Sequence, residues 1–461
     1  MSFSTFVTML GSAGAAGGAE PWALRISRDT FTASFDGIYI TENTITPDHE
    51  NGTYAILYDN DDNNTLVYRI DEDGTVLWRR KQSVSDYASD GSGSLGSSGS
   101  TSDLFVMGDF GSSNYAFRLN SSGSMQAHDD VWGGAGGVIC SHPSVGVVYS
   151  TNAANGSYKV EGLNQSTFAS VYSSNASITY MNGANTFYPY KYGSKLVYFP
   201  TDGNSAVYSS VLVNNHSQGL IKSIGNGTYT YKYVDYSGRS STPSSSAASI
   251  GSGYYESSTA KFKYYMHNTS SSFHEFTVDK DLTPDGSQYQ WTTSGVTARP
   301  TGFSEDSDGN RYFCLNYNNV FKVDASNNVV WGIEIVLGGA SSAAYSSENA
   351  FLSSDEDALY WSGRVRVGAN NYGATYIIKI PTDGGIDAGT YTDAGTSGDF
   401  QNVTITITDK TSALTPRAST LTSVSSGTVA ITTENNSAST DNTALTNAVQ
   451  SAFSNEVLTD L

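Results

Sequence analysis

The chain has 461 residues, a formal net charge of −20 and only 15% charged residues. Apart from the short run Arg79-Arg80-Lys81 it contains no cluster of Lys and Arg, which argues against a nucleic-acid-binding protein because contacts with phosphate need clustered cations. It also contains no apolar run long enough to span a membrane. Its 46 glycines and 31 tyrosines, with abundant Ser, Thr and Asn, are typical of short strands joined by polar turns. We therefore expect an all-β protein whose acidity keeps it soluble.

The N-terminal residues 1–20 join an apolar stretch to a Gly/Ala-rich one. This segment lacks the basic start of a signal peptide, and glycines interrupt its apolar run. We predict a flexible assembly arm that docks on a neighbouring subunit, with secretion directed by this segment as the alternative. Trp22 to Ile26 and Ile38 to Ile40 then form short extended segments that are suited to close a ring.

A short pattern recurs along the chain and is clearest at residues 67–78, VYRIDEDGTVLW. Two apolar segments flank the turn residues Asp-Glu-Asp-Gly, as in a β-hairpin, and the surrounding sequence predicts strands at 54–58, 65–70 and 75–79. Copies occur at residues 116–127, 320–331 and 377–388, with a looser one at 157–164. The third residue of each copy is basic and the fourth is apolar.

Strand-like segments between the copies extend the pattern into repeated units. Segments 104–110, 145–152 and 168–173 accompany the nearest copies, and residues 195–215 predict a further unit that ends near 220–224. Residues 226–294 are predicted to form one unit with a Ser-rich insertion, and units at 306–335 and 355–388 follow. The spacing of equivalent positions leaves room for about seven units.

Units of about 40 to 55 residues cannot bury both faces of their sheet alone and become stable by stacking on one another. Radial stacking hides these faces and leaves only short edges. We therefore predict that residues 21–395 form a β-propeller of about seven blades. Four tryptophans are expected to pack between blades and not to serve as ligand platforms: Trp78, Trp291, Trp331 and Trp361.

The C-terminal residues 396–461 are rich in Thr and Ser and lack the repeated pattern, although VTITIT and TVAITT resemble strands. In the last stretch, Leu445, Val449, Phe453 and Val457 are four residues apart behind Thr440 and Asp441, which predicts a short amphipathic helix. The apolar stripe of that helix needs a partner, either the propeller surface or another subunit.

Four acidic clusters offer oxygens that calcium accepts. They are Asp59, Asp61 and Asp62; Asp71, Glu72 and Asp73; Glu305, Asp306 and Asp308; and Asp355, Glu356 and Asp357. None has the spacing of an EF-hand, and all fall where the predicted units need turns, so we interpret them as turn residues.

The remaining reactive residues form no recognisable site. The histidines are scattered and lack zinc-site spacing: His49, His128, His142, His216, His267 and His274. Cys140 and Cys314 lie in apolar strand patterns, which predicts buried thiols. We therefore predict no catalytic, cofactor-binding or metal-binding residue, no cofactor and no enzyme activity. A glycosidase built from carboxylates on different units is the alternative.

The turn-and-strand segments DSDGNRYF and VFKVDASNNVVW resemble the quinoprotein-like and SBBP-like propeller repeats. The cofactor and metal residues of quinoprotein dehydrogenases have no match in this chain, so this resemblance implies the fold alone. The layout of the ends is similar to that of structural proteins of marine tailed bacteriophages, usually assigned to the tail. It consists of an MSF start, a PWALRIS strand and a Thr/Ser tail of the TSALTPRASTLTSVSSGTVAITT kind.

That second resemblance implies a structural virion protein, in the tail tip, fibre or hub, located in the phage particle. The N-terminal arm and C-terminal segment are then expected to contact other virion subunits in a homo-oligomer. Loops 85–103 and 237–258 are expected to contact a glycan or receptor on the host surface. Neither nucleic-acid binding nor membrane insertion is expected. The alternatives are an exported bacterial adhesin or lectin, and a capsid-decorating virion protein.

Overall fold

The protein was analysed as a computed structural model of the whole chain. The residues that it describes are 3–9, 20–28, 38–39, 45–48, 50–59, 64–83, 94–97, 103–110, 113–131, 137–142, 146–153, 157–164, 170–178, 187–188, 196–198, 207–213, 217–224, 228–236, 254–256, 261–279, 284–316, 318–338, 345–353, 355–367, 372–384, 386–392, 404–418, 424–428 and 431–434. Apart from the short 3-10 helix η2 (Thr411–Ala413), the regular structure in these ranges is β. No helix within them is long and apolar enough to cross a membrane.

The described strands form seven antiparallel sheets, which we number in chain order. Sheet 1 is built from β3 (Ile38–Tyr39), β4 (Ile45–Pro47), β5 (Thr53–Asp59), β6 (Asn64–Ile70) and β7 (Val76–Ser83). Sheet 2 is built from β8 (Ser94–Ser97), β9 (Leu104–Phe110), β10 (Ser113–Leu119) and β11 (Met125–Val131). Sheet 3 is built from β12 (Gly137–His142), β13 (Gly146–Ala153), β14 (Ser157–Asn164) and β15 (Ser170–Ile178).

The other four sheets follow the same plan. Sheet 4 contains β16 (Phe187–Tyr188), β17 (Leu196–Tyr198), β18 (Val207–Val213), β19 (Ser217–Ile224) and β20 (Thr228–Tyr236). Sheet 5 contains β21 (Tyr254–Glu256), β22 (Lys261–Thr269), β23 (Ser272–Asp279) and β24 (Pro284–Thr293). Sheet 6 contains β25 (Pro300–Glu305), β26 (Arg311–Leu315), β27 (Asn319–Val323) and β28 (Val329–Gly338). Sheet 7 contains β29 (Tyr345–Leu352), β30 (Ala358–Val367) and β31 (Tyr372–Pro381).

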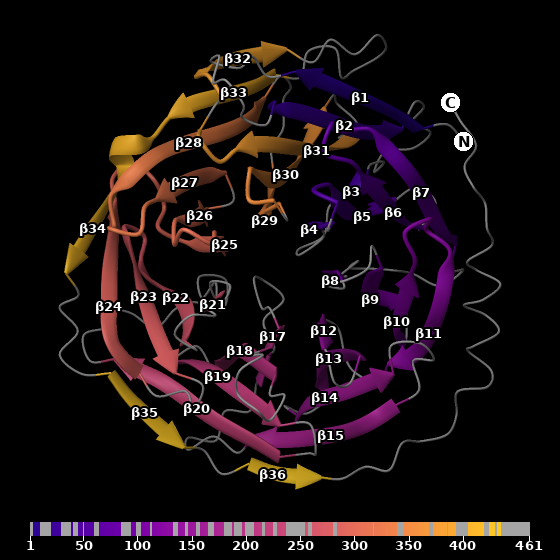
Figure 1. Cartoon of the computed structure of the whole chain (residues 1–461), viewed down its shortest axis with the longest axis vertical. Coiled ribbons are helices and arrows are strands. Elements are labelled where there is room, and N and C mark those ends of the chain that lie inside the picture. Colours follow the sequence, from indigo (N-terminus) through magenta and orange to yellow (C-terminus); the bar gives the residue numbers. More distant parts are fainter. Residues whose placement is uncertain are drawn as a thin grey trace.

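The seven sheets follow one another around a common centre, with one edge of each sheet facing inward (Figure 1). Inner strands of neighbouring sheets contact each other in the series β4, β8, β12, β17, β21, β25 and β29, and β29 contacts β4. The all-β class predicted from composition is therefore confirmed, and the number of sheets equals the number of predicted repeat units.

The predictions for residues 52–80 and for residues 226–294 have different outcomes. The strands expected around residues 52–80 are confirmed as β5, β6 and β7. The prediction of one unit at 226–294 is wrong, because β20 pairs with β19 in sheet 4 while β21 to β24 form sheet 5. The alternation of TYTYKYVDY identifies a strand but does not say whether its partner precedes or follows it.

The N-terminal strands complete sheet 7 from the far end of the sequence. Strand β2 (Trp22–Arg28) pairs with β31, and β1 (Phe3–Met9) pairs with β2. The segment at Trp22 to Ile26 thus joins the last repeat, as its sequence indicates. Part of the expected N-terminal arm, residues 3–9, is a strand at the outer edge of this sheet.

The C-terminal segment runs along the rim (Figure 1). Strands β33 (Thr404–Asp409), β34 (Leu414–Ala418), β35 (Val424–Thr428) and β36 (Ile431–Glu434) pair with β28, β24, β20 and β15 respectively, and β32 (Gly389–Thr392) pairs with β33. The boundary expected at residue 396 therefore does not separate these strands from the sheets. The predicted terminal helix lies outside the described residues.

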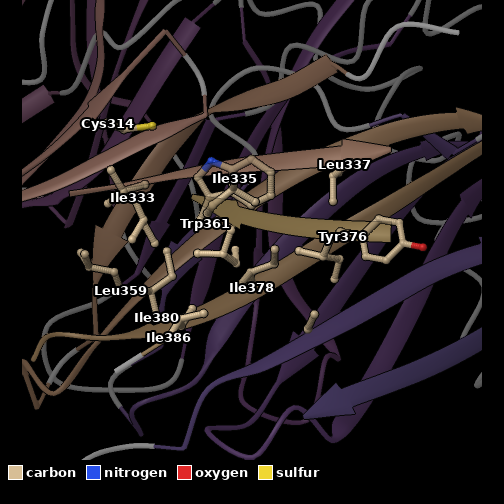
Figure 2. Packing of buried hydrophobic residues seen from close by; sticks show 14 of the residues in the cluster. Cys314, Ile333, Ile335, Leu337, Leu359, Trp361, Tyr376, Ile378, Ile380 and Ile386 are labelled. Carbon is tan, nitrogen blue, oxygen red and sulfur yellow. The ribbon is translucent and has the colours of Figure 1, made fainter. Parts of the chain in front are cut away.

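The hydrophobic core lies between neighbouring sheets. One cluster joins Cys314, Ile333 and Ile335 of sheet 6 to Trp361 and Ile378 of sheet 7 (Figure 2). A second joins sheet 7 and β2 to sheet 1, and a third joins sheet 5 to sheet 6. These clusters cover sheets 6 and 7 on both faces, and the inner strand β26 of sheet 6 is accordingly buried along its whole length without alternation.

Candidate functional site

The same polar turn recurs in the repeats and accounts for two of the four acidic clusters, those of Asp71 and Asp306. In sheet 1 the carboxylate of Asp71 accepts hydrogen bonds from the backbone N–H groups of Asp73 and Thr75. Asn120, Asp306 and Asp324 hold the equivalent turns in the same way. Such side-chain caps stabilise a turn locally. The interpretation of these residues as turn residues is confirmed.

The fourth residue of each turn has a left-handed backbone. Positive φ angles occur at Gly74 (84°), Gly123 (74°), Gly309 (79°), Asn327 (70°) and Gly384 (83°). In three of the hairpins the strand register shifts after the first residue pair beyond the turn, which marks a bulge in the second strand. This geometry leaves the carbonyl group of the second turn residue available to a neighbouring sheet.

That carbonyl group is bound by two side chains of the preceding sheet. Trp331 Nε1 and Lys322 Nζ of sheet 6 both donate to the carbonyl oxygen of Thr382 in sheet 7, at 3.0 and 3.1 Å. The two donors face each other across β27 and β28. We call this arrangement, a Trp and a basic residue on one turn carbonyl, the carbonyl clamp.

The carbonyl clamp recurs at the next two boundaries. At the boundary of sheets 7 and 1, Trp22 Nε1 and Lys379 Nζ donate to Glu72 O at 2.7 and 2.8 Å. In the next clamp, between sheets 1 and 2, the donors Trp78 Nε1 and Arg69 Nη1 bind Ser121 O at 2.7 and 3.0 Å. Each basic donor is the third residue of its repeat, which explains why that position is basic.

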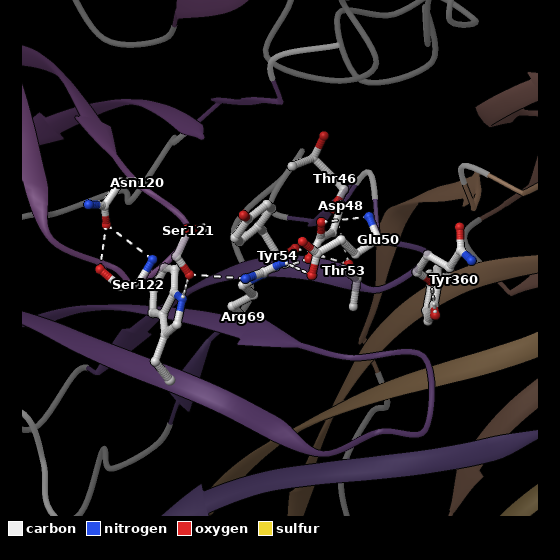
Figure 3. Close-up of polar contacts among 12 residues, drawn as sticks. Thr46, Asp48, Glu50, Thr53, Tyr54, Arg69, Asn120, Ser121, Ser122 and Tyr360 are labelled. Atoms are coloured by element: carbon white, nitrogen blue, oxygen red, sulfur yellow. Dashed lines mark hydrogen bonds and ion pairs between the residues drawn. The ribbon is translucent and has the colours of Figure 1, made fainter. Parts of the chain in front are cut away.

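Arg69 also makes ion pairs within its own sheet (Figure 3). Its Nε donates to Asp48 Oδ2 at 2.6 Å and its Nη2 donates to Glu50 Oε2 at 2.7 Å. Asp48 is fully buried. Burial acts to lower the pKa of Arg69, but the hydrogen bond to Asp48 and the nearby carboxylates outweigh it, so the pKa is raised. The guanidinium group is fixed between two sheets.

At the boundary of sheets 5 and 6 the residue that binds the tryptophan of the preceding sheet is acidic, and the cation belongs to the following sheet. Glu275 of sheet 5 accepts hydrogen bonds from Trp291 Nε1 at 3.1 Å and from Arg311 Nη1 of sheet 6 at 2.9 Å. Arg311 also binds the carbonyl oxygen of Asp324 at 3.2 Å and lies over the Trp291 ring, 5.5 Å from its centroid. Burial acts to lower the pKa of Arg311, whereas Glu275 raises it and prevails. A Trp and a cation again join neighbouring sheets.

The four predicted interblade tryptophans lie at boundaries between sheets. Trp78 contacts Gly123 and Trp331 contacts Gly384, each in the following sheet. Trp291 packs against Phe313 of sheet 6 at 5.3 Å between ring centroids. Trp361 belongs to the core cluster shared by sheets 6 and 7. Their expected role in packing is confirmed.

Other predicted residues form no cluster. Within the part of the chain that the structure describes, no group of three or more His, Cys, Asp or Glu side chains is arranged to hold a metal ion. Cys314 is a buried free thiol, as predicted. His274 is buried, and this burial lowers its pKa to about 4. Asp61, Asp62 and most of loops 85–103 and 237–258 lie outside the described residues.

Comparisons with known proteins identify no family for this chain. No protein-family model matches it, and neither does any curated protein. Among solved structures, a protein of unknown function from Bacteroides caccae is 9% identical, with a TM-score of 0.37 over 65% of this chain and 93% of that one. The AfRom2 CNH domain is 8% identical, with a TM-score of 0.41 over 81% of this chain and 99% of that one. Both TM-scores are below 0.5, so neither likeness bears on function.

Proposed function

We propose that this chain is a seven-bladed β-propeller that serves as a non-enzymatic structural protein of a tailed-phage virion, in the tail. The carbonyl clamp is the observation that carries the structural role. The basic residue and the tryptophan of the repeat are both used to fasten one sheet to the next, at three successive boundaries. A repeat whose polar side chains are used in this way builds a rigid platform.

The placement in a phage particle rests on the layout of the chain ends. Described parts of both ends are strands at the rim, namely β1 and β33 to β36. Strand edges at a rim are suited to assembly contacts, because backbone groups there pair with strands of other subunits. In this proposal the rim contacts neighbouring virion subunits, and the loops on one face contact a glycan or receptor of the host.

Mass spectrometry of purified particles tests the proposal. The phage whose genome carries this gene is propagated and purified on a density gradient, and its proteins are digested with trypsin. Peptides of this chain should co-sediment with the portal and tail proteins at a constant ratio across the particle peak. Their absence from the peak would refute the virion role. Antibody labelling viewed by electron microscopy then separates a tail position from a capsid-decorating one.

A further inference from the structure

Sheets 1 and 2 differ from the other sheets at the rim. The outer strands β15, β20, β24 and β28 each carry an added strand, and sheet 7 carries β2 and β1. In contrast, no described strand pairs with the outer edge of β7 or β11. An uncovered outer strand presents backbone N–H and C=O groups that accept another strand. These two edges lie side by side in the order of sheets.

The added strands run backward through the sheets in a fixed order. Along the chain, β33 pairs with sheet 6, β34 with sheet 5, β35 with sheet 4 and β36 with sheet 3, and every pairing is antiparallel. Short links at 410–413, 419–423 and 429–430 connect them. The next sheets in this direction are sheet 2, with the outer strand β11, and sheet 1, with the outer strand β7.

We propose that residues 435–461 continue this series as antiparallel strands, first on β11 and then on β7. Their length exceeds two steps of the kind that join β33, β34 and β35. The outer edges of β11 and β7 are thus an acceptor surface for an extended segment, and the ligand is the C-terminal segment of the same chain. This inference does not depend on the virion role.

Charge favours this occupant at β7, whereas β11 carries Asp129 and Asp130 and adds no such attraction. Residues 435–461 contain Asp441, Glu456 and Asp460 and no Lys or Arg, so the segment is acidic. Strand β7 contains the three successive cations Arg79, Arg80 and Lys81. Opposite charges on paired strands attract, and like charges repel.

The apolar spacing of the C-terminal segment is compatible with a strand. Leu445, Val449, Phe453 and Val457 are four residues apart, and positions four apart share one face of a strand as well as one face of a helix. The preceding strands β33 to β36 come from the same Thr/Ser-rich part of the chain. The proposal therefore replaces the terminal helix predicted from this spacing.

Hydrogen exchange of the full chain and of a variant that ends at Glu434 tests the proposal. Removal of residues 435–461 should make the amides of β11 and β7 exchange about tenfold faster or more, because an uncovered edge opens readily. The amides of β33 should be unaffected and serve as the internal control. A synthetic peptide of residues 435–461 should restore the slow exchange, whereas a scrambled peptide should not.

A substitution in the full chain keeps the test valid if the shortened chain fails to fold. Leu445→Pro removes a backbone donor within the expected strand and should accelerate exchange in β11, whereas Ser437→Pro in the expected link should not. Equal exchange of β11 and β7 in the full and shortened chains would overturn the proposal. So would protection that appears only at concentrations where the chain dimerises, because a second copy would then cover the edge.

Discussion

Trp331 donates its indole N–H to the carbonyl oxygen of Thr382 at 3.0 Å, and this bond joins sheet 6 to sheet 7. The same carbonyl oxygen receives Lys322 Nζ, so one turn of sheet 7 is held by two donors of the preceding sheet. Equivalent bonds bind Glu72 and Ser121. The repeat thus encodes, besides its hairpin, the contact between one hairpin and the next.

Trp331→Phe removes the indole donor but keeps an aromatic ring at this boundary. We expect it to lower the free energy of unfolding by about 1 kcal/mol, the usual net value of a hydrogen bond. Trp331→Ala, which also removes the packing, should cost about 3 to 5 kcal/mol. Urea denaturation measures both. Val330→Ala is the control, since Val330 is 49% exposed and its loss should change stability by less than about 0.5 kcal/mol.

Gly384→Ala tests the contact of the turn with the indole ring. A Cβ atom at Gly384 would lie 2.7 Å from Trp331 Cδ1, and the backbone there has a φ of +83°. Gly295 has a similar φ of +71° but no atom within 4 Å of its Cβ position. Gly295→Ala should therefore cost about 1 kcal/mol of backbone strain, and Gly384→Ala at least about 2 kcal/mol more through the clash. Equal losses in thermal unfolding would contradict the packing.

Glu275→Ala tests the ion pair at the boundary of sheets 5 and 6. The side chains of Glu275 and Arg311 are only 2% and 5% exposed, so removal of one leaves a buried charge unpaired and should cost about 3 to 5 kcal/mol. Glu334 and Lys410 form a matched pair at 3.0 Å with exposures of 27% and 26%. Glu334→Ala should cost about 1 kcal/mol or less. A double-mutant cycle with Arg311→Leu isolates the coupling energy.

Stability should fall as the pH drops below about 6.5 because of His274. Burial lowers the pKa of His274 to about 4, whereas an unfolded histidine binds its proton near 6.5. Between these values the unfolded chain binds more protons, so acid favours unfolding by up to about 2 kcal/mol at pH 5. His274→Gln should flatten the plot of unfolding free energy against pH between 7 and 5. An unchanged slope would assign the acid sensitivity to other groups.

Asp71→Asn and Asp71→Ala separate a turn cap from a calcium ligand. Asn120 already caps the equivalent turn of sheet 2 through its side-chain oxygen, so Asp71→Asn should keep the stability within about 0.5 kcal/mol. Asp71→Ala removes the acceptor and should cost about 1 kcal/mol. The melting temperature of the natural chain should be equal in calcium and in EDTA. A melting temperature that is higher in calcium than in EDTA, with the difference lost in Asp71→Asn, would show a metal site instead.

The local structure of the repeats could be predicted from sequence. The alternation around VYRIDEDGTVLW and its copies identifies strands and turns because each depends on residues that are close together in the chain. The copies also exposed the basic third position, and a Trp follows nine positions after it at Trp78 and Trp331. The sequence alone could not show what the basic residue and the Trp bind, because the carbonyl group that accepts both hydrogen bonds belongs to another repeat.

By itself, the sequence determined the all-β class, the hairpins, their polar turns and the burial of the tryptophans, since each follows from local pattern and composition. Only the tertiary structure decided which strands pair at the outer edges. There, β2 pairs with β31 and the Thr/Ser-rich C-terminal segment pairs with four different sheets. Such pairing is made by backbone N–H and C=O groups, which nearly every residue possesses, so the side chains carry little record of the partner.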